Sequence, residues 1–205
     1  MSEKKLRFET KQIHGGYHVD ATGSRGVAIY PTAAYHFKSC DYAAKLFELS
    51  EAGNIYTRIH NPTTAAYENR VAALYGGVGA LAAASGMSAI LLVVTALAKA
   101  GENIVTSPYV YGGTHNQFVI SLRNLGIDCR MAKSDSKEDI AALIDDNTRA
   151  VFVESMGNPT CRVADIEALA KVAHANNVPL IVDNTFGAGG YLCNPFEWGA
   201  DIVTD

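Results

Sequence analysis

Hydrophobic and polar residues follow two alternating patterns along most of this chain. Short apolar runs, such as residues 151–153 and 180–182, are typical of strands that are buried on both faces of a sheet. Between these runs lie segments of roughly ten to fifteen residues with helical periodicity. We expect strands at 80–85, 103–107, 127–132, 149–155, 179–184 and 200–205, and helices at 41–53, 61–77, 86–101, 112–126, 136–145 and 165–177.

The segment 61–77 carries the clearest helix signals. Asn61 is a favourable N-cap, Pro62 suits the first helical position, and Gly76 and Gly77 end the periodic pattern. From this segment onwards, strands alternate with helices, which indicates βαβ units around a mostly parallel sheet with helices on both faces. The sequence therefore predicts an α/β fold.

The first sixty residues differ from the remainder of the chain. They are rich in Gly, Tyr, His and Thr and show little periodicity apart from the predicted helix at 41–53. Such a segment can bury little apolar surface by itself. We therefore interpret residues 1–60 as an arm that contacts a neighbouring subunit, and residues 61–205 as the α/β domain.

Composition and charge narrow the class of protein. The 205 residues are 48% hydrophobic and 19% charged, which is ordinary for a globular protein. A net charge of -4 and the absence of a basic stripe argue against nucleic acid as a partner. The four cysteines are scattered and show no CxxC spacing; His14 and His18 are four residues apart, but Gly15 and Gly16 between them disfavour the helix that would bring both to one face. Since neither a signal peptide nor a membrane-spanning run is found, we expect a soluble, cytoplasmic protein without a metal.

Polar residues follow several of the predicted strands. In parallel sheets, ligands bind beyond the carboxyl ends of the strands. Ser85 and Gly86 open a helix there, where free N–H groups suit a phosphate. Tyr111 offers an aromatic face, and Asp183 a buried charge that requires a cation. A phosphate, a flat ring and a cationic ring nitrogen together describe pyridoxal 5'-phosphate.

Longer stretches of the sequence resemble a known family. The segments YTRIHNPTTAAYENRVAALYGG, SGMSA, YVYGGTHNQF, VESMGNPT and VDNTFGAGGYLCNPFEWGADIVTD are similar to the cystathionine gamma-synthase-like family of Cys/Met-metabolism enzymes. The resemblance implies the fold type I of pyridoxal phosphate enzymes. Within the family, the sequence motifs YGGT-x-NQF and DNTFGAGGY favour the O-acetylhomoserine sulfhydrylase branch over the lyases.

The resemblance also implies roles for individual residues. Gly86 and Met87 would donate backbone N–H groups to the cofactor phosphate beside Ser85, and Tyr111 would stack on the ring. Asn158 would bind the ring hydroxyl, and Asp183 would pair with the ring nitrogen, which makes Tyr111 and Asp183 the catalytic candidates. Glu154 and Thr185 would support this set. Tyr56 and Arg58 would reach the cofactor phosphate of a neighbouring subunit. The active site would then be shared between the two subunits of a dimer, within a homotetramer.

The resemblance implies a γ-replacement in which O-acetylhomoserine and sulfide give homocysteine and acetate. The family carries its Schiff-base lysine in a Ser-x-Thr-Lys segment after the strand that matches residues 200–205. The chain ends at Asp205 before such a segment, so we expect an N-terminal fragment that lacks the C-terminal domain and is inactive alone. A γ-lyase acting on methionine or cystathionine, and a non-catalytic fragment, are the alternatives.

Overall fold

The computed structural model describes residues 6–205, so the first five residues of the predicted arm lie outside the described part of the chain. By its internal contacts the chain divides into two compact units, residues 6–82 and 83–205. Each unit is described here by itself. The division of the chain into an arm up to residue 60 and a domain from residue 61 stays a prediction.

The second unit is built on a five-stranded sheet, in which every pair of neighbouring strands is parallel. The strand order is β2-β1-β3-β4-β5. The strands are β1 (Asn103–Thr106), β2 (Asp128–Met131), β3 (Thr148–Glu154), β4 (Leu180–Asp183) and β5 (Ile202–Thr204). The predicted parallel α/β architecture is therefore confirmed.

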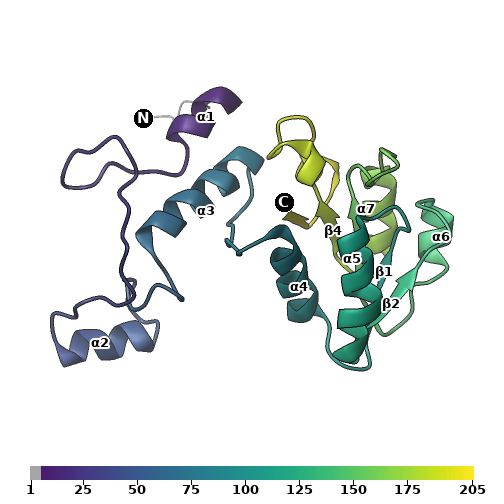
Figure 1. The fold of residues 1–205 in the computed structure, drawn as a ribbon, viewed down its shortest axis with the longest axis horizontal. Coiled ribbons are helices and arrows are strands. Elements are labelled where there is room, and N and C mark those ends of the chain that lie inside the picture. Colours follow the sequence, from purple (N-terminus) through teal and green to yellow (C-terminus); the bar gives the residue numbers. More distant parts are fainter. Residues whose placement is uncertain (1–5) are drawn as a thin grey trace. The chain divides into compact units, whose positions relative to one another are not determined.

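Helices cover both faces of this sheet, as Figure 1 shows. One face packs against α4 (Gly86–Leu97) and the π-helical turn η1 (Gln117–Leu122), which directly continues α5 (Gly112–Asn116). The other packs against α6 (Lys137–Ala141), α7 (Ile166–Ala175) and the 3₁₀ turn η3 (Pro195–Trp198). This two-sided cover explains why residues 150–153 of β3 and 180–182 of β4 are continuously apolar, because both faces of these central strands are buried.

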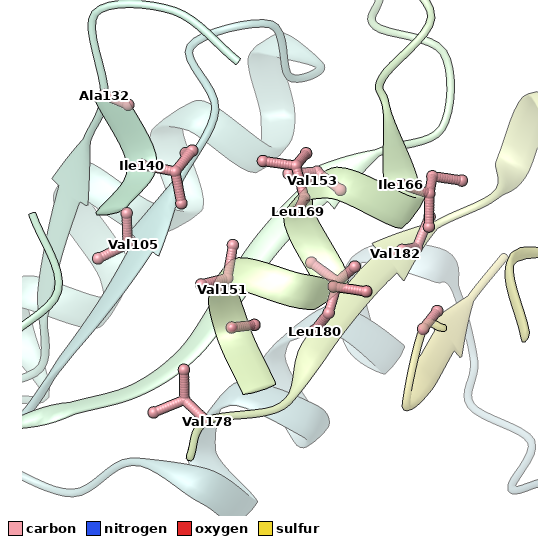
Figure 2. Packing of buried hydrophobic residues seen from close by; sticks show 13 residues of the cluster. Val105, Ala132, Ile140, Val151, Val153, Ile166, Leu169, Val178, Leu180 and Val182 are labelled. Atoms are coloured by element: carbon pink, nitrogen blue, oxygen red, sulfur yellow. The ribbon is translucent and has the colours of Figure 1, made fainter. Parts of the chain in front are cut away.

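Successive side chains of a strand enter opposite layers of the core. On the α7 face, Val151, Val153, Leu180 and Val182 pack against Leu169, and Figure 2 shows these side chains gathered between α7 and the strands. The intervening residues of the same strands pack on the α4 face with Ile90, Val94, Phe118 and Leu122; they are Ala150, Phe152 and Ile181. This alternation fixes the direction in which the last residue of each strand points.

Five of the predicted strands and the predicted helices are present, although most helices are shorter than expected. The prediction of a strand at 80–85 is wrong, since these residues form no strand and do not pair with the sheet. The segment is largely alanine, which has weak strand propensity, and Leu81 is exposed. The helix expected at 112–126 is also interrupted, because η1 widens it to π-helical geometry.

The first unit consists of three helices joined by long irregular segments: α1 (Phe8–His14), α2 (Cys40–Phe47) and α3 (Pro62–Tyr75). The caps of α3 match the prediction. The Asn61 side chain accepts a hydrogen bond from Thr63 N, and Gly76 ends the helix with a left-handed φ of 73°. Within residues 6–205, every helix is too short or too polar to cross a lipid bilayer.

The aromatic pair on the α4 face supports a stability prediction. Phe152 and Phe118 are almost fully buried, and their rings meet edge to face with centroids 4.9 Å apart. Phe152→Ala should lower the free energy of unfolding by about 3–5 kcal/mol, because it leaves a cavity at the centre of the sheet. Denaturant unfolding measures this loss. Leu192→Ala, at an exposed position, should change the value by less than about 0.5 kcal/mol. Equal effects of the two substitutions would contradict this account of the core.

Candidate active site

Two carboxylates end neighbouring strands at the centre of the sheet. Glu154 is the last residue of β3 and Asp183 the last of β4, and the parallel register places them opposite each other. They lie two positions after Phe152 and Ile181, so strand periodicity directs both side chains to the α4 face. The apolar strands therefore end in acidic groups on the rim of one layer of the core.

A cavity of about 300 Å³ opens at this rim. Its walls come from the residues that follow β1, β3 and β4 and from the first turns of α4 and α5. They are Ser85, Gly86, Met87, Ile90, Tyr111, Thr114, Glu154, Met156, Asn158, Asp183, Thr185 and Phe186. Every predicted site residue of the second unit is in this set. The other two predicted residues, Tyr56 and Arg58, belong to the first unit.

The start of α4 forms one wall. Ser85 is its N-cap, and the Ser85 Oγ accepts a hydrogen bond from Ser88 N at 3.2 Å. Among residues 6–205, no group accepts a hydrogen bond from the N–H of Gly86 or Met87. Two free N–H groups and the positive end of the helix dipole make this wall suitable for an anion.

The next helix holds the start of α4 in place. Gln117 Nε2 donates a hydrogen bond to the carbonyl oxygen of Met87 at 3.0 Å, and Thr114 Oγ1 lies 3.9 Å from Met87 Sδ. Gln117 begins the π-helical turn η1, where the wider helix alters the direction of its side chains. The neutral side chains of Gln117 and Thr114 therefore hold the start of α4, the wall suited to an anion.

Tyr111 stands at the mouth of the cavity, with half of its surface exposed (51%). It precedes α5 as the N-cap residue. Its ring lies against Gly113, where a Cβ atom would be only 2.5 Å from Tyr111 Cε1. The glycine therefore leaves room for the ring, whose accessible surface is suited to stacking on a flat ligand.

Glu154 is buried beneath this mouth, with 7% of its surface exposed. Its Oε1 accepts a hydrogen bond from Tyr111 N at 2.6 Å, and its Oε2 accepts one from Asn158 N at 3.3 Å. Burial raises the pKa of Glu154 from 4.5 to about 7; the neighbouring charge of Asp183 adds to this rise, and the two N–H donors oppose it.

Asp183 is equally buried but differently bonded. Its Oδ1 accepts hydrogen bonds from Thr185 N at 3.0 Å and from Thr185 Oγ1 at 2.6 Å. Among residues 6–205, no hydrogen-bond donor reaches its Oδ2. The described lining also contains no Lys, Arg or His. A carboxylate with one oxygen available in such a cavity favours a cationic ligand group.

The loop after β3 brings Met156 and Asn158 to the cavity. Met156 forms an isolated antiparallel bridge with Val163, and Gly157 N donates a hydrogen bond to the Arg162 carbonyl at 2.9 Å. Gly157 also passes very close to Tyr109, since a Cβ atom at Gly157 would be 2.6 Å from the Tyr109 carbonyl oxygen. This close approach holds the loop against the segment that precedes Tyr111.

Arg162 secures the same loop from the outside. Its Nε donates hydrogen bonds to both carboxylate oxygens of Asp135, at 2.7 and 2.8 Å. Its guanidinium carbon lies 5.0 Å from the centre of the Tyr109 ring. The loop that carries Asn158 is therefore joined to the loops after β2 and β1.

Sequence reasoning missed four residues of the lining: Ile90, Thr114, Met156 and Phe186. Helix spacing could have identified Ile90 and Thr114, because Ile90 lies three residues after Met87 in α4 and Thr114 lies three residues after Tyr111, the N-cap of α5. Phe186 directly follows Thr185 in the sequence. Met156 gives no local signal, since its position depends on the bridge to Val163.

The cavity fits the expected cofactor in size and chemistry. Ligand sites of this kind are largely apolar and carry a few converging polar groups. Here a helix start suited to an anion, an exposed aromatic ring and a carboxylate with an available oxygen line one space. These features match a phosphate, a flat ring and a protonated ring nitrogen, respectively.

The raised pKa of Glu154 supports a prediction about pH in the cofactor-free, full-length protein. The pKa of this group is 4.5 when unperturbed and about 7 in the folded state, so folding favours the protonated form. The contribution of Glu154 to stability should therefore fall as pH rises from about 4.5 to 7, by up to about 3 kcal/mol. Glu154→Gln should remove this part of the pH dependence.

Denaturant unfolding at several pH values, compared between the wild type and Glu154→Gln, measures the difference. Glu167→Gln, on the exposed surface of α7, is the matched control and should leave the pH dependence as in the wild type. A difference between wild type and Glu154→Gln that stays constant from pH 4.5 to 8 would contradict the assignment.

Comparison with known proteins gives consistent results. The chain is 54% identical over 205 residues to a homocysteine synthase of Schizosaccharomyces pombe, covering 100% of this chain and 48% of the relative. It is 54% identical over 201 residues to O-acetyl-L-homoserine sulfhydrylase 1 of Thermus thermophilus, covering 97% of this chain and 48% of the relative. The chain thus spans about half the length of the curated relatives it matches.

A solved structure agrees with the fold. A Campylobacter jejuni protein described as an O-acetylhomoserine (thiol)-lyase, with a pyridoxyl-lysine monophosphate, superposes with a TM-score of 0.93 at 38% identity. The match covers 97% of this chain and 48% of that one. The sequence profile of the family described as "Cys/Met metabolism PLP-dependent enzyme" matches residues 9–205. With nearly the whole chain matched, and pyridoxal phosphate as the family's cofactor, this protein belongs to the Cys/Met metabolism PLP-dependent enzymes.

Proposed function

We propose that the full-length protein catalyses a γ-replacement in which O-acetylhomoserine and sulfide give homocysteine and acetate. The C–O bond at the γ carbon breaks, a C–S bond forms, and acetate leaves. The observation that carries the proposal is the available Oδ2 of Asp183 in a cavity that also contains the free N–H groups of Gly86 and Met87. The relatives named for homocysteine synthesis support the choice of reaction.

The residues of the cavity suggest how the cofactor is held. The N–H groups of Gly86 and Met87, beside Ser85, would bind the phosphate, and Tyr111 would stack on the ring. The side chain of Asn158 would bind the ring hydroxyl. When bound, pyridoxal phosphate supplies an electron sink that stabilises a carbanion at the substrate Cα.

Asp183 would keep the proton on the ring nitrogen, since a carboxylate beside a protonated ring favours the charged form of both groups. The two hydrogen bonds from Thr185 fix the carboxylate through Oδ1 and leave Oδ2 for this contact. Tyr111, which stands at the mouth, would assist proton transfer near the leaving group. Thr185 thus acts on Asp183, whereas Asp183 and Tyr111 act on the bound molecules.

The first unit suggests a contribution across a subunit interface. Tyr56 and Arg58 are exposed, and the Arg58 guanidinium carbon lies 5.3 Å from the centre of the Tyr56 ring. An exposed arginine beside an aromatic ring is well suited to bind a phosphate. We propose that these residues reach the phosphate of a neighbouring subunit in a dimer, that two dimers form a tetramer, and that the enzyme is cytoplasmic.

The reaction is tested by incubating the full-length protein with O-acetylhomoserine and sulfide and measuring homocysteine and acetate. We expect sulfide-dependent formation of both products and none without pyridoxal phosphate. If the protein instead forms 2-oxobutyrate from methionine or cystathionine and no homocysteine, the γ-lyase alternative replaces the proposal.

Asp183→Asn tests the role of the carboxylate. Asparagine keeps an oxygen that can accept the hydrogen bonds of Thr185, so the fold should survive, but it cannot remain negatively charged. We expect kcat to fall about a hundredfold or more, the scale seen when a preorganised electrostatic contact is lost. Steady-state kinetics measure this fall, and circular dichroism verifies the fold. Unchanged turnover would remove Asp183 from the mechanism.

Arg58→Ala tests the shared site. This variant should retain pyridoxal phosphate more weakly and lose activity, because a phosphate contact is missing. When it is mixed with Asp183→Asn subunits, mixed dimers should contain one site with both residues intact. Random pairing then restores roughly a quarter of the sites, as a symmetric interface requires. If activity stays at the level of the separate variants although subunits exchange, the site is not shared.

A further inference from the structure

We propose that Glu154 is a positioning residue, whose carboxyl group holds the backbone of Tyr111 and Asn158 in place and so orients the two residues that contact the bound ring. It acts through these two residues and not by binding the ring itself. The consequence for the cofactor rests on the proposed function, whereas the link between the two backbone segments does not.

The hydrogen bonds of Glu154 join two separate parts of the chain. Tyr111 lies between β1 and α5, and Asn158 lies in the loop between β3 and α7. One carboxyl group accepts the N–H of both residues, through different oxygens, at 2.6 and 3.3 Å. Glu154 itself is held in the sheet as the last residue of β3. The backbone positions of Tyr111 and Asn158 are therefore tied to the centre of the sheet.

Asp183, the neighbouring carboxylate on this rim, differs from Glu154 in the number of its oxygens that accept hydrogen bonds from the protein. Asp183 is bonded through one oxygen only, and its other oxygen is available. Glu154, in contrast, has a backbone donor on each oxygen. The two acids lie opposite each other in the sheet but have different roles: Asp183 is available to a ligand, whereas Glu154 binds the protein backbone.

Without Glu154 the two N–H groups would lack their acceptor. An unsatisfied N–H in a partly buried wall is costly, so the backbone would move to reach water or another acceptor. Such a movement would displace the ring of Tyr111 and the amide of Asn158 together. Small displacements of contact residues weaken binding and orientation without any loss of a direct ligand contact.

Hydrogen exchange at the individual amides of Tyr111 and Asn158 tests the link in the cofactor-free, full-length protein. Glu154→Gln keeps one acceptor oxygen but replaces the other with an NH₂ group, which cannot accept a hydrogen bond. We expect the shorter bond, to Tyr111, to persist and the Asn158 amide to exchange about tenfold faster. Glu154→Ala should speed exchange at both amides by a similar factor.

Glu167→Gln and Glu167→Ala are the matched controls and should change neither amide, because Glu167 lies exposed on α7. A folded Glu154→Gln protein with wild-type exchange at Asn158 would overturn the proposal. If Glu154→Ala does not fold, Glu154→Gln still decides, since its predicted effect at one amide and not at the other is local.

Binding of pyridoxal phosphate gives the second readout. Glu154→Gln should bind the cofactor about tenfold more weakly and weaken the visible circular dichroism of the bound ring, since its contact residues are less well ordered. If the Asn158 amide exchanges faster but the affinity for pyridoxal phosphate and the dichroism of the bound ring are unchanged, Glu154 does not act on the cofactor through Tyr111 and Asn158. If the wild type takes up no cofactor, the proposed function fails, while the exchange experiment still decides the backbone link.

Discussion

The parallel register between β3 and β4 is the constraint on which the site depends. Pairing Val153 with Val182 necessarily places Glu154 opposite Asp183 one residue later. Strand periodicity then directs both carboxylates to the layer that contains α4 and α5. A shift of one residue in this register would turn one acid toward the α7 face, whose core cluster is made of hydrophobic side chains. The hydrophobic packing of the sheet and the chemistry of its rim are therefore specified by the same contacts.

Around these two carboxylates, different parts of the cavity wall suit ligand groups of opposite charge. The α4 wall offers the free N–H groups of Gly86 and Met87, whereas the β4 end offers the Asp183 carboxylate, and the described lining contains no Lys, Arg or His. This arrangement suits one orientation of a ligand that has a negative and a positive end, because the reverse orientation would bring its negative end to the carboxylate. Tyr111 and Phe186 limit the remaining space between the two ends. Orientation thus follows from the polarity of the cavity before any single contact is considered.

Much of this arrangement could be predicted from the sequence, because it depends on strong local signals. The apolar runs gave the strands, the Asn61 and Gly76 caps gave α3, and the rule for parallel sheets placed the polar strand ends on one rim. The assignment of residues 80–85 as a strand failed because apolar character does not establish strand pairing. Met156 was missed because its bridge to Val163 within the same loop gives no periodic signal, and the π-helical turn begins at Gln117, whose side chain hydrogen-bonds to the distant Met87. Long-range contacts leave little trace in local periodicity.

The narrow passage of Gly157 beside Tyr109 has a consequence for how this protein can vary. No side chain fits at Gly157 without pushing apart the loops that follow β1 and β3. Gly157 does not line the cavity, but it lies between Met156 and Asn158, which do. The nearest atoms are the carbonyl oxygen and the Cβ of Tyr109, which remain when the ring is trimmed, so a larger residue at position 157 requires the backbone of one of these two loops to move.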